Sequence, residues 1–370
     1  MCWPPAAPAT SVSPSGSSLA AKSEWKIAVI QDAPSEFAHQ FMYPGGGFVL
    51  GNALGWVQIV DRMFRADGGT VHQFLGVFTG PRVMRRAVAT LPVADADIAL
   101  TGRRVRWFQE WIRHGPVDPY WQNSDHRANV ARMPPVVYLQ GGWYDFYLRG
   151  MFADYAALRT AGRTVRLLIG PWGHGRGLYT RVGMRDAFAA LDAVLGDGTP
   201  PSGVRVFITG SGRWTDLPGW PPHARDTAWY LHPAGGLSTH LASAGPPSRF
   251  RYDPANPTPS IAGIAVGLSP GPADNRRLEA RPDVLSFTSD PQAADLEVIG
   301  PVRVLQHVQA SQAHIDLHAR LCDVTQRGRS INVSDGIVRL TDAAPDAPHP
   351  VEFDLWPIAH TFRRGHRIRL

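Results

Sequence analysis

The sequence predicts a parallel α/β region followed by an all-β region. Between residues 136 and 209, β-branched apolar runs alternate with amphipathic segments of helical period, which is typical of a parallel sheet covered by helices. After about residue 227, only short apolar runs between Gly and Pro turns remain, which favours a β-sandwich. The chain has 370 residues, and this length suits about two domains. We expect their boundary in the Pro-, Gly- and Trp-rich stretch 212–226.

The composition excludes several classes of protein. The formal charge is +6, but among 37 cationic residues only Lys22 and Lys26 are lysines, and the arginines are scattered. A nucleic-acid surface usually clusters its cations on one face. No apolar run approaches the roughly 20 residues of a membrane helix. Cys2 and Cys322 are too few for a disulfide framework or a four-thiolate zinc site. We therefore expect neither nucleic acid nor membrane as a partner.

The first half opens on irregular sequence. Residues 1–24 are rich in Pro, Ser and Ala, have no strand or helix period and lack the basic and apolar regions of a signal peptide, so we predict an irregular leader. Residues 25–30 are a short apolar run of the strand type. Gly turns and helical patterns rich in Trp and Phe follow, as at 52–63 and 105–113.

A β-loop-α-β unit comes next. The predicted strand 136–140 ends in Gly-Gly-Trp-Tyr-Asp, and an amphipathic helix at 151–161 stops at Gly162, a residue favoured just after a helix. The next strand, 165–169, ends in Gly-Pro-Trp-Gly-His-Gly. A further helix and strand are predicted at 184–195 and 204–209.

Two ionisable side chains follow these strands. Asp145 and His174 are separated by one β-α-β step, and functional groups of parallel sheets lie at the carboxyl ends of strands. Neighbouring strands would bring the two side chains together. An Asp that orients an imidazole is half of a nucleophilic triad, and Asp before His is the chain order of α/β-hydrolases.

Each residue also has a plainer interpretation. Asp145 is placed to cap a turn or the helix that follows, and His174 to be a solvated loop histidine. The glycines at 170–177 would suit a phosphate-binding loop, but neither GK[ST] nor GxGxxG occurs there. Taken together, the two strand-end loops in hydrolase order favour the catalytic interpretation.

The second half reads as short strands. They are predicted at 228–232, 284–288, 295–298, 315–324, 331–334, 337–340, 351–355 and 368–370. His314, Asp316 and His318 would share one face of a strand and could suggest a metal site, but the surrounding pattern is that of a sandwich core and rim. We expect no metal and no organic cofactor.

Several motifs together resemble the CocE/NonD hydrolase family, which includes X-Pro dipeptidyl-peptidases, cocaine-esterase-like enzymes and glutaryl acylases. The resemblance covers residues 25–370. Its motifs are the segments at 44–47, 54–56, 118–121, 141–145 and 170–175, and in the second half those at 295–300, 316–324, 336–339, 355–357 and 365–368. It implies a partial α/β-hydrolase domain at 25–212, with a helical cap at about 47–130, followed by a jelly-roll β-sandwich at 226–370.

The resemblance also implies roles for residues. Asp145 would be the acid and His174 the base of a Ser-Asp-His triad. Phe41, Trp56 and Tyr147 occupy the positions whose aromatic side chains line the acyl or leaving-group pocket in family members. Plain core packing is the alternative for these three.

The chain departs from the family at the nucleophile. The family serine lies in G-x-S-Y-x-G, and no G-x-S-x-G occurs in this sequence. Ser13 and Ser18 lie near glycines, but neither follows an apolar strand, and Pro14 removes an N–H that the oxyanion hole would use. We therefore expect a chain truncated at both ends, an unpaired edge on the strand at 25–30, and hydrolysis little above background.

The sequence thus predicts a serine hydrolase of ester or amide bonds, with an acyl group or an X-Pro dipeptide as the group released. The alternative is an inactive remnant whose β-sandwich serves only as a binding or interaction module. The expected partner is a small ester, amide or short peptide. A cytoplasmic location is expected, and a homodimer is left open.

Overall fold

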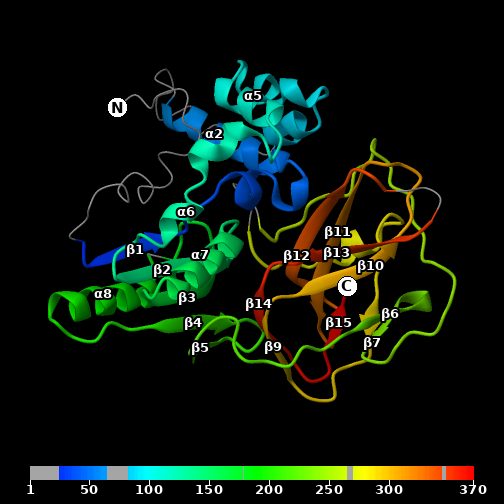
Figure 1. Ribbon diagram of the computed structural model, residues 1–370. Helices are drawn as coiled ribbons and strands as arrows, with labels where there is room; N and C mark the ends of the chain where they lie inside the picture. The colour runs from blue at the N-terminus through cyan, green and yellow to red at the C-terminus, as the bar shows by residue number, and fades with distance from the viewer. Residues whose placement is uncertain (1–24, 65–81, 178, 265–269, 344–346) are drawn as a thin grey trace.

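The computed structural model describes residues 25–64, 82–177, 179–264, 270–343 and 347–370 (Figure 1). The predicted leader, with Ser13 and Ser18, lies outside the described residues. Within them, no helix combines the length and the apolar character needed to cross a bilayer.

The first half is built on a five-stranded sheet. In spatial order its strands are β1 (Ile27–Gln31), β2 (Val136–Tyr144), β3 (Thr164–Gly173), β4 (Gly203–Ile208) and β5 (Arg213–Leu217). The first four strands run parallel, and β5 pairs antiparallel with β4. The first sheet therefore continues past residue 212, the expected end of this domain.

Two helices cover opposite faces of this sheet. Alternate residues of a strand point to opposite faces. On β2, Val137 and Leu139 share a core with α7 (Leu148–Thr160), whereas Tyr138 shares a core with α8 (Arg181–Leu195). This burial on both faces explains why the β2 and β3 runs read as nearly continuous apolar sequence.

A helical region separates β1 from β2 and gathers above the sheet in Figure 1. Its elements are η1 (Ala38–Met42), η2 (Pro44–Gly46), α2 (Leu50–Phe64), η3 (Val93–Asp95), α4 (Ala96–Thr101), α5 (Arg106–Arg113), η4 (Pro119–Ser124) and α6 (Arg127–Val130). Aromatic side chains dominate its core, among them Phe37, Phe41 and Trp111. The helical patterns predicted at 52–63 and 105–113 correspond to α2 and α5.

The second half is mostly strands. They are β6 (Tyr230–His232), β7 (Gly236–Ser238), β8 (Thr288–Ser289), β9 (Leu296–Gly300), β10 (Arg303–Val308), β11 (Ile315–Val324), β12 (Ser330–Leu340), β13 (His349–Asp354), β14 (Ile358–Phe362) and β15 (Arg367–Arg369), with short η5 (Pro233–Gly235) and α9 (Arg276–Glu279). They form a six-stranded sheet in the order β12-β11-β15-β8-β7-β6 and the pairs β10-β13 and β14-β9. One apolar cluster unites them.

The sequence misplaced several of these strands. The two strands predicted at 331–334 and 337–340 are one strand, β12, which runs through Gly336. This glycine is required by packing, because a Cβ there would lie 2.5 Å from the Asp354 carbonyl oxygen. The strand predicted at 284–288 overlaps the observed β8 only at Thr288, and β5, β7, β10 and β14 were missed. Pairing across the sheet, which a local pattern does not contain, decides these limits.

The two halves are joined by backbone contacts. Thr209, just after β4, exchanges hydrogen bonds with β14: its N–H donates to the Ala359 carbonyl and its carbonyl accepts from the Thr361 N–H, both at 2.9 Å. On the other side, Gly45 of η2 packs so closely on β12 that a Cβ would lie 1.9 Å from the Ile337 carbonyl oxygen. The β-rich half therefore contacts both the first sheet, at Thr209, and the helical region, at Gly45.

Candidate active site

Asp145 and His174 follow directly after the neighbouring strands β2 and β3. The two strands are parallel and in register at Gly142 and Gly170. Both side chains therefore emerge at the same carboxyl edge of the sheet. The His174 Nδ1 lies 3.0 Å from the Asp145 Oδ2. The Asp145 side chain is fully buried, whereas the His174 side chain is 39% exposed.

Both carboxylate oxygens of Asp145 are occupied. Oδ2 faces His174, and Oδ1 accepts the backbone N–H of Tyr147 at 2.7 Å. The second bond belongs to the turn that leads into α7, so the plain turn role considered for Asp145 is present alongside the contact with His174. Two fixed acceptor bonds leave this carboxylate one orientation, which in turn orients the imidazole.

Neighbouring aromatic rings and carboxylates determine the packing and the pKa of the His174 imidazole. Its ring stacks on Phe146 with centroids 4.5 Å apart and meets the edge of Tyr147 at 5.5 Å. Burial alone would lower the pKa of His174, but the hydrogen bond and charge of Asp145, with a contribution from Asp32, outweigh it and raise the pKa above the ordinary histidine value. Within the described residues, Asp145 is the ring's hydrogen-bond partner, which leaves Nε2 free to exchange a proton.

Asp32 is a third ionisable residue at this edge, and sequence reasoning missed it. It follows directly after β1, and its Oδ2 accepts the backbone N–H of Gly175 at 2.7 Å. Burial, with the charge of Asp145 adding to it, raises the pKa of Asp32 to about 8. A signal did exist: like Asp145 and His174, Asp32 is an ionisable residue at the carboxyl end of a parallel strand.

Among the described residues, Asp32, Asp145 and His174 form a group that could hold a metal ion. One potential ligand atom from each of them lies within 4.8 Å of the other two. The hydrogen bond between Asp145 and Nδ1 of His174 matches an acid–imidazole pair, in which that nitrogen carries a proton rather than a metal. The carboxylate of Asp316, considered above as a ligand, instead accepts two hydrogen bonds from Arg339, each at 2.7 Å.

The predicted aromatic residues lie in the core of the helical region. The Phe41 ring contacts Phe146 at 4.7 Å and Tyr147 at 5.5 Å, so it reaches the dyad through the two rings that touch His174. Trp56, on α2, is partly buried and packs against the same core. Phe146 was not singled out from the sequence, although it adjoins Asp145.

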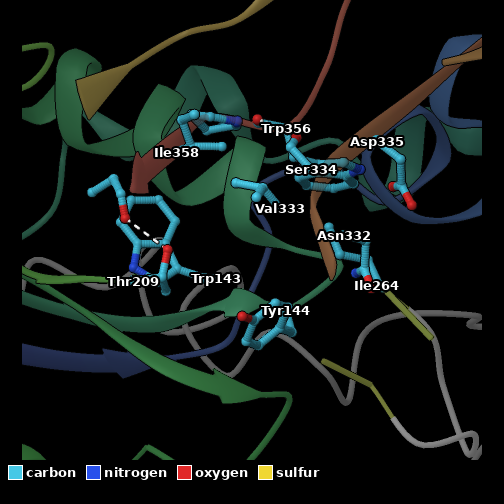
Figure 2. A pocket seen from close by; sticks show the side chains of 13 residues that line it. Trp143, Tyr144, Thr209, Ile264, Asn332, Val333, Ser334, Asp335, Trp356 and Ile358 are labelled. Atoms are coloured by element: carbon cyan, nitrogen blue, oxygen red, sulfur yellow. Dashed lines mark hydrogen bonds between the residues drawn. The ribbon is translucent and has the colours of Figure 1, made fainter. Parts of the chain in front are cut away.

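A small pocket lies between the two halves, beside the dyad but separate from it. Figure 2 shows Trp143 and Tyr144, at the end of β2, facing residues of β12 and β14. Neither Asp145 nor His174 lines the pocket, and its free volume is about 20 Å³. This volume suits one or two water molecules and not an acyl group or a dipeptide.

Comparison with known families matches both halves. Residues 17–176 match the model described as X-Pro dipeptidyl-peptidase (S15 family). Residues 197–370 match the model described as X-Pro dipeptidyl-peptidase C-terminal non-catalytic domain. The chain is 26% identical to a cocaine esterase of a Rhodococcus species, over 88% of this chain and 64% of that protein. It is 24% identical to a putative serine esterase of Mycobacterium bovis, over 68% of this chain and 46% of that protein.

Solved structures share the fold. An aminopeptidase from a marine sediment archaeon matches with a TM-score of 0.70 at 21% identity, over 93% of this chain and 64% of that one. A CocE/NonD family hydrolase from Staphylococcus aureus matches with a TM-score of 0.62 at 15% identity, over 93% and 59% of the two chains. These likenesses support a mixed α/β fold, and the chain spans about 64% of the first of these relatives. With both family models matched, the chain belongs to the CocE/NonD-like X-Pro dipeptidyl-peptidase family of hydrolases.

Proposed function

We propose that this chain carries the acid and the base of a serine hydrolase that cleaves ester or amide bonds. One observation carries the proposal: a fully buried carboxylate, Asp145, holds the exposed imidazole of His174 at 3.0 Å on the edge of a parallel sheet. An imidazole held on one side and free on the other has the geometry of a general base.

The proposed mechanism uses the two nitrogens of His174 differently. Nε2 takes the proton of a serine hydroxyl as its oxygen attacks the acyl carbon, and then gives that proton to the leaving group. Nδ1 stays hydrogen-bonded to Asp145, which selects the tautomer and stabilises the imidazolium formed during attack. Backbone N–H groups stabilise the oxyanion. In this proposal the serine belongs to the family's G-x-S-Y-x-G elbow, which this sequence lacks.

Esters are the favoured substrate class, and X-Pro amides the second. The two curated relatives named above are esterases. A dipeptidyl-peptidase needs an acidic anchor for the amino terminus of its substrate, and Asp32 does not suit this role because it is 5% exposed and bonded to Gly175. Phe41, Trp56 and Tyr147 are proposed to shape the acyl or leaving-group side.

The finer architecture is part of the same proposal. We assign residues 25–217 to the α/β-hydrolase domain, which extends past the expected limit of 212 because β5 pairs with β4, with its cap at about 47–130, and residues 226–370 to a jelly-roll β-sandwich. The support is the parallel order β1-β2-β3-β4 and the single apolar cluster that unites the later strands. A cytoplasmic location and a small ester, amide or short peptide as partner complete the proposal, with a homodimer left open.

The first test uses the chain as it stands. A fluorophosphonate probe, which modifies activated serines, is expected to label the purified protein no more than its heat-denatured form, because the elbow motif is missing. Labelling of the native chain that Ser13→Ala abolishes would contradict this part of the proposal and place the nucleophile in the leader.

The second test supplies the elbow. The elbow-bearing N-terminal part of the Rhodococcus cocaine esterase is fused ahead of residue 25, and cooperative unfolding is verified. We expect the fusion to take the probe and to hydrolyse p-nitrophenyl butyrate, and His174→Gln to abolish both. Asp154→Asn is the matched control, since Asp154 is a buried carboxyl that contacts Ser35 instead of His174. A folded fusion that neither labels nor hydrolyses would favour the inactive, binding-only alternative.

A further inference from the structure

Asp32 joins the dyad from a third strand. It follows β1, and its backbone N–H donates to the Gln140 carbonyl of β2 at 2.9 Å. Its φ of +44° lies in the left-handed region, where a residue other than glycine is held only when its surroundings determine it. The side chain is 5% exposed. This residue is therefore fixed in backbone and in burial.

One oxygen of Asp32 holds the loop that carries the imidazole. Oδ2 accepts the Gly175 N–H at 2.7 Å, and Gly175 is the residue after His174. Gly175 itself turns with a φ of +73°. Because the imidazole projects from the preceding residue, fixing this amide restricts the backbone from which His174 reaches Asp145.

The other oxygen lies in an unusual environment. Oδ1 of Asp32 is buried and has no hydrogen-bond partner among the described residues. Among the described residues, the titratable groups that face Asp32 are Asp145, His174 and Tyr147, and no lysine or arginine is among the groups that shift its pKa. The residues beside Oδ1 on β2 and α7, Gly141 and Met151, carry no charge. Two buried carboxyl groups beside a single imidazole cannot both ionise easily, so one of them retains its proton.

We propose that Asp32 is a positioning residue of the Asp145–His174 dyad, which holds the His174 loop as a neutral acid and, when it ionises, adds a second negative charge that strengthens the imidazole as a base. Its pKa of about 8 and the contribution of its charge to the raised pKa of His174 agree with this geometry. The consequence for catalysis rests on the proposed function, whereas the positioning and the charge coupling do not.

Two substitutions separate the two parts of the proposal. Asp32→Asn keeps an oxygen that can accept the Gly175 N–H but removes the titration. Asp32→Ala removes both. Asp154→Asn is the control, because it neutralises a buried carboxyl of α7 that contacts Ser35.

The charge coupling is tested by NMR titration of the His174 Hε1 signal, assigned with His174→Gln. We expect the parent protein to show the imidazole titration and a second inflection near pH 8. Asp32→Asn should lose the second inflection and titrate its imidazole at a lower pH than the parent, whereas Asp154→Asn should match the parent in both. A single inflection in the parent, or a second one that survives in Asp32→Asn, would overturn the coupling.

The positioning is tested by amide exchange at Gly175 at pH 6.5. We expect exchange at least tenfold faster in Asp32→Ala and unchanged in Asp32→Asn. Equal exchange in all three proteins would overturn the anchoring role. Because neither measurement needs turnover, a folded fusion that fails to react with the probe sinks the proposed function and leaves this inference standing.

Discussion

Two regions of the molecule in which an aspartate contacts a histidine differ in the hydrogen bonding of the imidazole. In one region a ring nitrogen has no partner among the described residues, and in the other both nitrogens have one. At the sheet edge, His174 uses Nδ1 on Asp145 and is 39% exposed. In the β-rich half, His360 uses Nδ1 on the Thr209 hydroxyl at 2.8 Å and Nε2 on Asp323 at 3.2 Å, and its side chain is 7% exposed. Both of its nitrogens are occupied.

In the buried cluster around His360, one aspartate is shared by two histidines. Asp323 accepts from His366 as well, at 2.8 Å, so one carboxylate satisfies two imidazoles between β11, β14 and the turn before β15. Thr209 connects the cluster to the first half. An Asp–His contact is therefore a poor indicator of catalysis by itself. A free, accessible ring nitrogen distinguishes the dyad, and a fully satisfied ring marks a structural joint.

The largest expected difference between the regions is in rate. In the elbow-supplied fusion, Asp145→Asn should lower kcat by about 10³–10⁴-fold, because the imidazole loses its tautomer and the imidazolium its counter-charge. The same change at Asp323 should leave kcat per folded molecule within about twofold. Ester hydrolysis, corrected for the folded fraction by circular dichroism, measures both. Equal losses would remove the distinction between dyad and joint.

The next effect is on the free energy of unfolding, and it is expected in the β-rich half and not at the dyad. Asp323→Ala leaves one nitrogen of the buried His360 and one of the partly buried His366 without an acceptor, so the free energy of unfolding should fall by about 2–4 kcal/mol. The control is Asp316→Ala on the same strand, an exposed pair with Arg339 expected to cost at most about 1 kcal/mol. Urea unfolding of the chain measures both, and similar losses would mean that the cluster is not a special joint.

A smaller loss is expected from changing Thr209, which connects the cluster to the first half. Thr209→Val keeps the side-chain shape but removes the hydroxyl that faces His360 Nδ1, which should cost about 1 kcal/mol. Ser211→Ala, two residues on, should change the free energy of unfolding by no more than about 0.5 kcal/mol. If the valine variant is as stable as the parent, His360 finds another partner and the joint between the halves does not depend on Thr209.

The smallest effect is the pH dependence that His174 contributes. Its folded-state pKa is raised, so the stabilisation from its protonated form is full below the unfolded value of about 6.5 and is lost as pH rises through the folded value. Its exposure screens the charge and keeps the effect small. The stability advantage of the parent over His174→Gln should therefore shrink between pH 6 and pH 9. An advantage that grows with pH would have the wrong sign for an imidazole paired with a carboxylate.

The local sequence pattern was sufficient to predict that Asp145 and His174 lie side by side. The β-loop-α-β sequence at 136–169 predicts adjacent parallel strands, and adjacency alone places Asp145 beside His174. Asp32 was not predicted to lie at the site, because its strand precedes a helical region of about a hundred residues. No local pattern shows that β1 pairs with β2. Phe146 escaped because a single aromatic residue after an aspartate has no periodic signal.

By itself, the sequence determined the alternating α/β half, the strand-rich second half and the placing of Asp145 and His174 after neighbouring strands, because these depend on residues close together in the chain. Only the tertiary structure decided which histidine keeps a free nitrogen, which strand carries the second acid of the site, and that Gly336 lies within a continuous strand. Those outcomes depend on contacts between distant segments, such as Thr209 with His360 and Asp32 with Gly175, where burial and hydrogen-bond satisfaction act together.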